Sequence, residues 1–149
     1  MTTKRRSTMK NNLLNTIGFY ISRTQAKMQY HFLQKLKPYG VTPEQWVLYA
    51  SLSEEEGISL TELAKVSLRD KPYTTRLVDK LEEKGLILRI KSNDDKRSSS
   101  IFLTRDGAKL KEKIIPIIAE LNQWSLVAMS EEEIGLLKFL LNKMYDHIK

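Results

Sequence analysis

The hydrophobic pattern of this 149-residue chain changes its period twice. Up to Gly85 the apolar residues recur every three or four positions, which is the spacing of one face of a helix. Residues 86–91 and 101–104 instead alternate in polarity, which is the spacing of a strand, and the stretch SNDDKRSSS at 92–100 between them is polar throughout. After residue 104 the helical spacing returns. The pattern therefore predicts a mainly α fold with a small β-hairpin, an α+β class.

Three segments ahead of the hairpin carry signals for the start of a helix. TPEQ at 42–45 and SLTE at 59–62 are capping boxes, in which a hydroxyl and a Gln or Glu side chain exchange hydrogen bonds with the backbone. Asp70 is the expected cap of a third helix, which Gly85 ends. The second and third segments, joined by a short turn at 67–69, have the form of a helix-turn-helix. With the hairpin they predict a winged helix-turn-helix.

The helical stripe at 11–37 is longer than a small domain can cover. As a single helix it would extend about 40 Å, and such a stripe indicates a second subunit. The expected organisation is a disordered basic tail at 1–9, an N-terminal dimerisation helix at 10–40, a winged helix-turn-helix DNA-binding domain at 41–105 and C-terminal dimerisation helices at 106–149.

The positive charge is distributed unevenly. The formal charge is +7, and residues 1–43 hold eight basic side chains and no acidic one. Residues 61–105 hold eleven basic and seven acidic side chains. Unequal charge of this kind is typical of a surface that faces a polyanion. Solvated helix faces and a basic tail are the alternative interpretation.

Several function classes find no support in the sequence. The chain has no Cys, which excludes disulfides and thiol chemistry. It has no apolar run long enough to span a bilayer, so we expect a soluble, cytoplasmic protein with no membrane partner. It also lacks a Gly-rich phosphate loop and a nucleophile elbow, and His31 and His147 have no metal-ligand spacing. We therefore expect neither an enzyme nor a metal or cofactor.

The residues expected to contact DNA fall into three groups. The exposed start of the third helix, at 71–76, is expected to read bases, with Arg76 suited to guanine O6 and N7. Basic residues around it suit phosphates, and Arg97 at the tip of the wing suits a narrow minor groove. A generic helical hairpin and an ordinary surface loop remain alternatives. The expected DNA-binding residues are Lys65, Arg69, Lys71, Pro72, Tyr73, Thr74, Thr75, Arg76, Lys80, Asp95, Lys96, Arg97 and Ser98.

These segments resemble the MarR family of transcriptional regulators (multiple-antibiotic-resistance regulator type). The resemblance is most specific in TTRLVDKLEEKGLILR at 74–89 and DDKRSSSIFLT at 94–104, and looser in TPEQWVLYASL at 42–52. It implies a homodimer with interleaved terminal helices, recognition helices in successive major grooves of a pseudo-palindromic operator, and Asp95 and Arg97 as the wing pair. Tyr73 departs from the small hydroxyl or acidic residues more often found there, so the operator sequence cannot be transferred.

The resemblance also implies an effector, because many members of the family respond to small, often phenolic, ligands between the dimerisation helices and the DNA-binding domain. The function expected is a sequence-specific homodimeric repressor released by a phenolic or other lipophilic ligand. The alternative is a nonspecific architectural DNA- or RNA-binding protein. For Trp46 and Tyr49, the alternative to a place in the ligand crevice is a place in the hydrophobic core. The residues expected to line the ligand crevice are Tyr20, Arg23, Thr24, His31, Trp46 and Tyr49.

Overall fold

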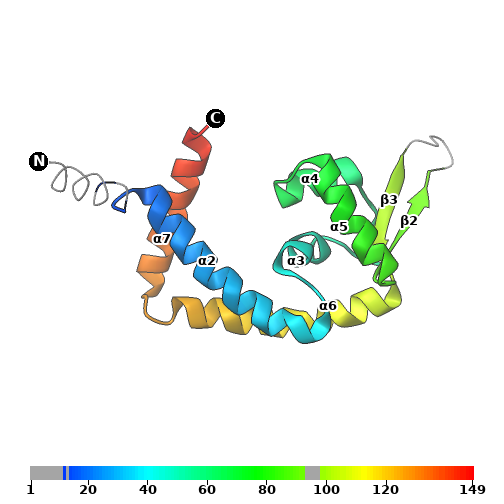
Figure 1. Cartoon of the computed structure of the whole chain (residues 1–149), viewed down its shortest axis with the longest axis horizontal. Helices are drawn as coiled ribbons and strands as arrows, with labels where there is room; N and C mark the ends of the chain where they lie inside the picture. Colours follow the sequence, from blue (N-terminus) through cyan, green and yellow to red (C-terminus); the bar gives the residue numbers. More distant parts are fainter. Residues whose placement is uncertain (1–11, 13, 93–97) are drawn as a thin grey trace, which may run out of the picture.

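The computed structural model describes residues 12, 14–92 and 98–149. The expected mainly α fold with a small β-sheet is confirmed (Figure 1). The helices are α2 (Ile17–Leu36), the 3-10 helix η1 (Lys37–Tyr39), α3 (Pro43–Ala50), α4 (Leu60–Ser67), α5 (Lys71–Glu83), α6 (Arg105–Leu126) and α7 (Glu131–His147). The strands are β1 (Ile58–Ser59), β2 (Ile87–Lys91) and β3 (Ser99–Leu103).

α3, α4 and α5 begin at the caps that the sequence predicts. The capping boxes Thr42–Gln45 and Ser59–Glu62 are both formed, with the side chain and backbone of each pair bonded in both directions. The Asp70 carboxylate accepts the backbone N–H of Tyr73 at 2.7 Å and so starts α5. Gly85 ends α5 with a φ of 69°. These local interactions satisfy N–H groups that a helix end otherwise leaves without partners.

The first described helix is shorter than the predicted stripe. α2 has 20 residues and begins only after Thr16, which interrupts the helical pattern. The backbone of Thr16 is extended, and its hydroxyl oxygen accepts the N–H of Phe19. A helix of this length extends about 30 Å. The predicted tail at 1–9 lies outside the described residues.

The sheet has three strands in the order β1-β3-β2, so the predicted hairpin was incomplete. Both pairings are antiparallel, with Ile58 opposite Ile101 and Arg89 opposite the same residue on the other side. The pattern of the sequence did not reveal β1 because two residues are too few to show an alternation.

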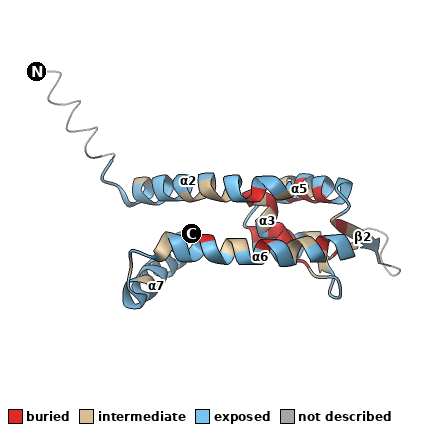
Figure 2. Cartoon of the chain, turned by 90° about the horizontal axis from the view of Figure 1, so that it is seen from below, coloured by how far each residue is buried: buried red, intermediate tan, exposed pale blue. Residues whose placement is uncertain are grey.

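Two clusters of buried side chains hold the fold together. The larger one lies where α3, α4 and α5 meet the sheet, and it includes Tyr49, Leu63 and Val78. The smaller one, Leu36, Val41 and Ile114, joins the end of α2, the start of α3 and the middle of α6. Figure 2 shows the buried residues gathered around α3 and the neighbouring parts of α5 and α6.

The helices outside this core leave much apolar surface exposed. α2 and α6 run side by side, and α7 turns away from the end of α6 (Figure 1). α7, all of whose residues are described, has no buried side chain (Figure 2). The larger cluster is made of buried residues between positions 48 and 103, whereas α7 buries none of its side chains within one chain.

Candidate nucleic-acid interface

The start of α5 presents a basic surface. Lys71, Pro72, Arg76 and Lys80 are exposed on this helix, as predicted. Lys65 and Arg69, at the end of α4 and in the following turn, are exposed beside them. Asp70 caps α5 with its carboxylate, and no acidic residue occupies the first turn that follows, so the attraction for an anion there comes from the exposed basic side chains.

Tyr73 organises two of these cations. Its ring is half-buried against the core of the domain, and the guanidinium carbons of Arg69 and Arg76 lie 5.2 and 5.7 Å from the ring centroid. Cation–π contacts at such distances are attractive and leave the N–H groups at the guanidinium edge available for hydrogen bonds. Tyr73 therefore contributes to the surface by positioning Arg69 and Arg76.

The two threonines of this helix differ from the prediction. Thr74 is fully buried, and its hydroxyl donates to the Asp70 carbonyl at 2.8 Å, so its expected place on the base-reading surface is wrong. Thr75 is half-buried, and its hydroxyl donates to the Lys71 carbonyl at 2.9 Å. The helical spacing turns position 74 toward the same side as the core residues Leu77 and Val78.

An ion-pair network ties the wing to α5. Arg89 of β2 binds Asp79 of α5 through its terminal nitrogen, and its Nε lies 3.3 Å from the Glu82 carboxylate. That Nε is buried and the contact does not have the geometry of a hydrogen bond, so the pair with Asp79 is the stronger of the two. The sequence analysis does not predict these ion pairs. The pattern that indicates them is a pair of carboxylates three positions apart on a helix, Asp79 and Glu82, and a basic residue, Arg89, on the next strand.

The tip of the wing is only partly described. Asp95, Lys96 and Arg97, the predicted minor-groove residues, lie outside the described residues. Ser98 is described and exposed, and its carbonyl accepts the backbone N–H of Ser92 at 3.0 Å, which closes the base of the loop.

Hydrogen bonds from side chains to backbone carbonyls join α3 to the first half of α6. The Tyr49 hydroxyl donates to the Gly107 carbonyl. Lys111 Nζ donates to the carbonyls of Ala50 and Leu52, each at 2.8 Å, and so satisfies the end of α3. Burial raises the pKa of Tyr49 to about 12 and lowers the pKa of Lys111.

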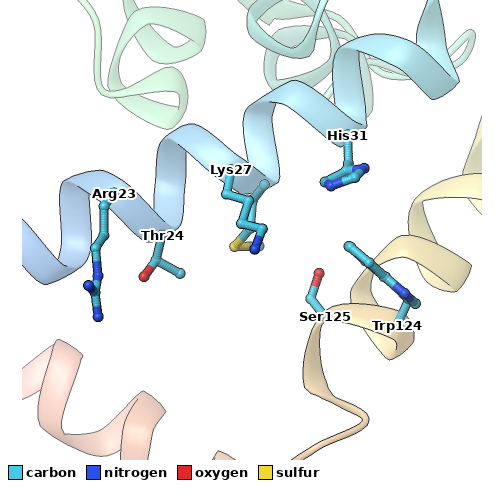
Figure 3. Close-up of a pocket in the computed structure, with 7 residues that line it drawn as sticks. Arg23, Thr24, Lys27, His31, Trp124 and Ser125 are labelled. Atoms are coloured by element: carbon cyan, nitrogen blue, oxygen red, sulfur yellow. The ribbon is translucent and has the colours of Figure 1, made fainter.

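A cavity of about 600 Å³ lies between α2 and the end of α6. In Figure 3 the labelled side chains of α2 extend from one side of the helix into the cavity; Lys27 and His31 lie opposite Ser125 and Trp124 of α6, and Arg23 lies farther from them. The cavity is lined by Arg23, Thr24, Lys27, Met28, His31, Trp124 and Ser125.

Three of the six predicted ligand residues line this cavity: Arg23, Thr24 and His31. Tyr20 is exposed and stacks on the Arg23 guanidinium at 4.4 Å. Tyr49 is fully buried, and Trp46 packs against both core clusters, so the core alternative holds for these two residues. The sequence pattern had not identified Lys27 and Trp124.

Two kinds of feature are absent from the part of the chain that the structure describes. None of its helices is long and apolar enough to cross a membrane. Within the same residues, no group of three His, Asp or Glu side chains has a geometry that would hold a metal ion.

These elements define a winged helix-turn-helix DNA-binding protein. The helix-turn-helix is formed by α4, the turn and the basic start of α5, and the wing is formed by the paired strands β2 and β3. A model of the MarR family matches residues 41–99. The chain is 30% identical over 105 residues to the organic hydroperoxide resistance transcriptional regulator of Bacillus subtilis (strain 168), covering 70% of this chain and 71% of that protein.

Solved structures agree with this match. The chain resembles MepR in the S. aureus MepR–DNA complex with a TM-score of 0.85 and 30% identity, covering 89% of this chain and 98% of that one. It resembles a mutant of E. coli MarR complexed with operator DNA with a TM-score of 0.82 and 28% identity, covering 89% of this chain and 96% of that one. The chain belongs to the MarR family, and it is a transcriptional regulator that binds DNA.

Proposed function

We propose that this regulator is a homodimeric repressor that binds a pseudo-palindromic operator and is released from it by a small ligand. One observation carries the proposal. The same chain presents a basic helix start on its DNA-binding domain and an uncovered apolar surface on its terminal helices. A second copy that covers the apolar surface would fix the distance between two recognition helices.

The terminal helices support the dimer. Side chains that a stable monomer would bury are exposed along α7 and at the start of α2, and contiguous apolar surface of this kind marks protein interfaces. A symmetric pair would bring both recognition helices to one face of DNA, one helical turn or about 34 Å apart. The exposed apolar residues are Ile17, Ile21, Leu136, Leu137, Phe139, Leu140, Leu141, Tyr145 and Ile148.

The recognition surface supports sequence-specific binding. Arg76 and Lys71 are exposed on α5, where we expect them to contact base edges. Lys65, Arg69 and Lys80 are also exposed, and we expect them to contact phosphates. For the wing, we propose that Arg97 enters the flanking minor groove, with Asp95 holding its guanidinium and Lys96 and Ser98 beside it. A repressor of this geometry acts by occupying promoter DNA.

Sedimentation and footprinting test this function together. We expect a dimer in solution and protection of a site with two half-sites on one face of a duplex. A monodisperse monomer would contradict the dimer. Equal affinity for unrelated duplexes, or for single-stranded RNA, would favour a nonspecific architectural or RNA-binding protein instead.

The cavity between α2 and α6 supports release by a ligand, and its charge indicates the class. Arg23, Lys27 and His31 are spaced by four residues on α2, so they line one side of the cavity, and none of its seven lining residues is acidic. The Trp124 ring, which contacts His31 at 4.8 Å, offers an apolar surface opposite. These groups favour an aromatic anion, such as a carboxylate or an ionised phenol, over a neutral lipophile.

Benzoate and benzamide are a matched pair of probes for this site, because they have the same shape and differ in charge. We expect benzoate to raise the melting temperature of the protein and to weaken operator binding, and benzamide to do neither. Arg23→Gln should abolish the difference, whereas Lys113→Gln, at an exposed position of α6 outside the cavity, should keep it. Equal effects of the two probes would contradict an anion site.

A further inference from the structure

The turn between α4 and α5 contains a leucine in an unfavourable conformation. Leu68 has a φ of 56° and a ψ of 34°, in the left-handed region. Among the residues that the structure describes, it is the only one other than glycine with a positive φ. In this region the Cβ of an L-residue crowds the neighbouring carbonyl oxygen, so most chains place glycine there.

The conformation is imposed by the way α4 ends. The N–H of Leu68 donates to the Lys65 carbonyl and the N–H of Arg69 donates to the Ala64 carbonyl, both at 3.2 Å. This pair of bonds is the Schellman motif, and its left-handed position is the one that glycine usually occupies. Leu68 therefore costs free energy that a glycine at the same position would not.

The side chain of Leu68 does not recover this cost within the chain. It is 72% exposed, and Val66, on the last turn of α4, is 54% exposed. An exposed leucine gains none of the stabilisation that burial of apolar surface provides. Backbone strain without a compensating contact inside the fold is a feature of functional positions.

The surroundings of Leu68 indicate what it contacts. Lys65 and Arg69 are exposed on either side in the sequence, and Asp70, two residues later, caps α5. In Figure 1, α5 runs from its start beside α4 toward the beginning of α6, so this turn lies at the end of α5 remote from α6. Leu68 is thus an apolar point inside the basic surface that surrounds the start of α5.

Double-stranded DNA is a polyanion that also carries an apolar group which Leu68 could contact. In the major groove the C5-methyl of thymine is the apolar group on the base edges, and it identifies an A·T pair. Phosphates on either side of the groove would be within the reach of the flanking Lys65 and Arg69. Contacts from exposed cations to phosphates add affinity without reading sequence, so a partner with phosphates gains from both cations.

We propose that Leu68 is a specificity-determining residue that packs against a thymine methyl in the major groove. The inference rests on the proposed function, in which α5 enters that groove. It adds an apolar contact from the preceding turn to the polar contacts of Arg76 and Lys71. The strained backbone is then the cost of directing this side chain at DNA.

The test uses Leu68→Gly in the full chain and a duplex site selected from random sequences. We expect Leu68→Gly to raise the melting temperature by about 2–4 °C, since the strain is relieved. The same variant should bind the site about fourfold more weakly for each half-site. This loss is what the removal of one apolar group from a buried contact would cause. Leu68→Met should retain the affinity, and Leu68→Asn, which tolerates the left-handed region but is polar, should lose it.

Uracil in place of single thymines identifies the partner group, because uracil differs by the methyl alone. Wild-type protein should lose affinity at one thymine per half-site, and Leu68→Gly should show no further loss at that thymine. Val47→Ala, a change at an exposed apolar residue of α3, should affect neither measurement. Wild-type affinity of Leu68→Gly, or a loss unrelated to any thymine, would overturn the inference. Failure of the wild type to select a site would instead contradict the proposed function.

Discussion

The guanidinium of Arg89, on the first strand of the wing, forms an ion pair with the carboxylate of Asp79 in the middle of the recognition helix α5. The pair joins the two elements expected to contact different grooves of DNA. Both side chains are partly exposed, so solvent screens part of the attraction. The ion pair therefore contributes more to the angle between wing and helix than to the stability of the domain.

A double-mutant cycle measures this contribution. Asp79→Ala and Arg89→Ala should each lower the free energy of unfolding, with a coupling energy of about 0.5–1 kcal/mol that decreases in high salt. Urea denaturation in low and high salt provides the values. Glu83→Ala, at an exposed position of the same helix, is the matched control and should change little. A coupling energy of zero in low salt would show that the wing is held by the backbone ladder alone.

The buried hydroxyl of Tyr49 makes stability depend on alkaline pH. Its pKa in the folded protein is raised from 10 to about 12 by burial, so the unfolded chain loses this proton first. The contribution is fully present below pH 10 and is lost as the pH rises from 10 to 12. Denaturation of wild type and Tyr49→Phe across this range should show a loss of about 2–3 kcal/mol in the wild type that the variant lacks.

At neutral pH the same variant has a second effect. Tyr49→Phe removes the hydrogen bond from the Tyr49 hydroxyl to the Gly107 carbonyl, and we expect a loss of about 1 kcal/mol. Tyr30→Phe, at an exposed position of α2, is the control and should alter neither value. An alkaline slope that persists in Tyr49→Phe would assign the effect to another group.

Gly107, in the first turn of α6, permits a close approach to the backbone of residue 86. A Cβ at this position would overlap the Leu86 carbonyl oxygen, and both groups belong to stiff backbone. Gly107→Ala should therefore cost about 3 kcal/mol in the free energy of unfolding. Gly135→Ala is the control, because a Cβ there has no atom within 4 Å among the described residues, and it should gain about 0.5–1 kcal/mol. Near-wild-type stability of Gly107→Ala would mean that α6 shifts freely against the sheet.

Three substitutions in α5 separate base contacts, phosphate contacts and packing. Arg76→Ala should cost about 1–3 kcal/mol of operator affinity and relax specificity at one base pair. Lys80→Ala should weaken all sequences alike and reduce the salt slope by about 1. Thr74→Val should lower stability and leave specificity unchanged, since the Thr74 side chain is fully buried. Binding isotherms at several salt concentrations, on matched and mutated sites, distinguish the three.

The wing offers a parallel prediction. Arg97→Ala should weaken operator binding while preserving discrimination in the major groove, because a minor-groove contact reads width and potential more than sequence. Affinity measured on operators with altered flanks provides the readout. Unchanged affinity at moderate salt would show that the wing does not contact DNA.

Local sequence signals were sufficient where the interactions are themselves local. The capping boxes at Thr42 and Ser59, the cap at Asp70 and the stop at Gly85 involve residues a few positions apart, so the bonds that form can be inferred from the residue types. The exposed basic start of α5 followed from the same spacing. Thr74 was predicted to be exposed but is buried. The limit of the buried face depends on how far the helix is rotated about its axis against its neighbours.

Contacts between distant residues required the tertiary structure. The ion pair of Arg89 with Asp79 and the bonds from Lys111 to the end of α3 depend on how elements pack, which periodicity does not encode. The cavity also depends on packing, since it combines residues of α2 with Trp124, far along the chain on α6. The strand β1 is defined only by its pairing with β3.

The sequence by itself determined the helices from α3 onward and the two wing strands, the caps at Thr42, Ser59 and Asp70, and that a basic surface would surround one helix start. Those properties follow from hydrophobic period, caps and charge, all of which act over a few residues. The tertiary structure alone decided which side chains are exposed beside the start of α5, which face the core, and that Leu68 is held exposed in a left-handed turn. Those properties depend on the mutual rotation of packed elements, and packing selects that rotation over the whole domain.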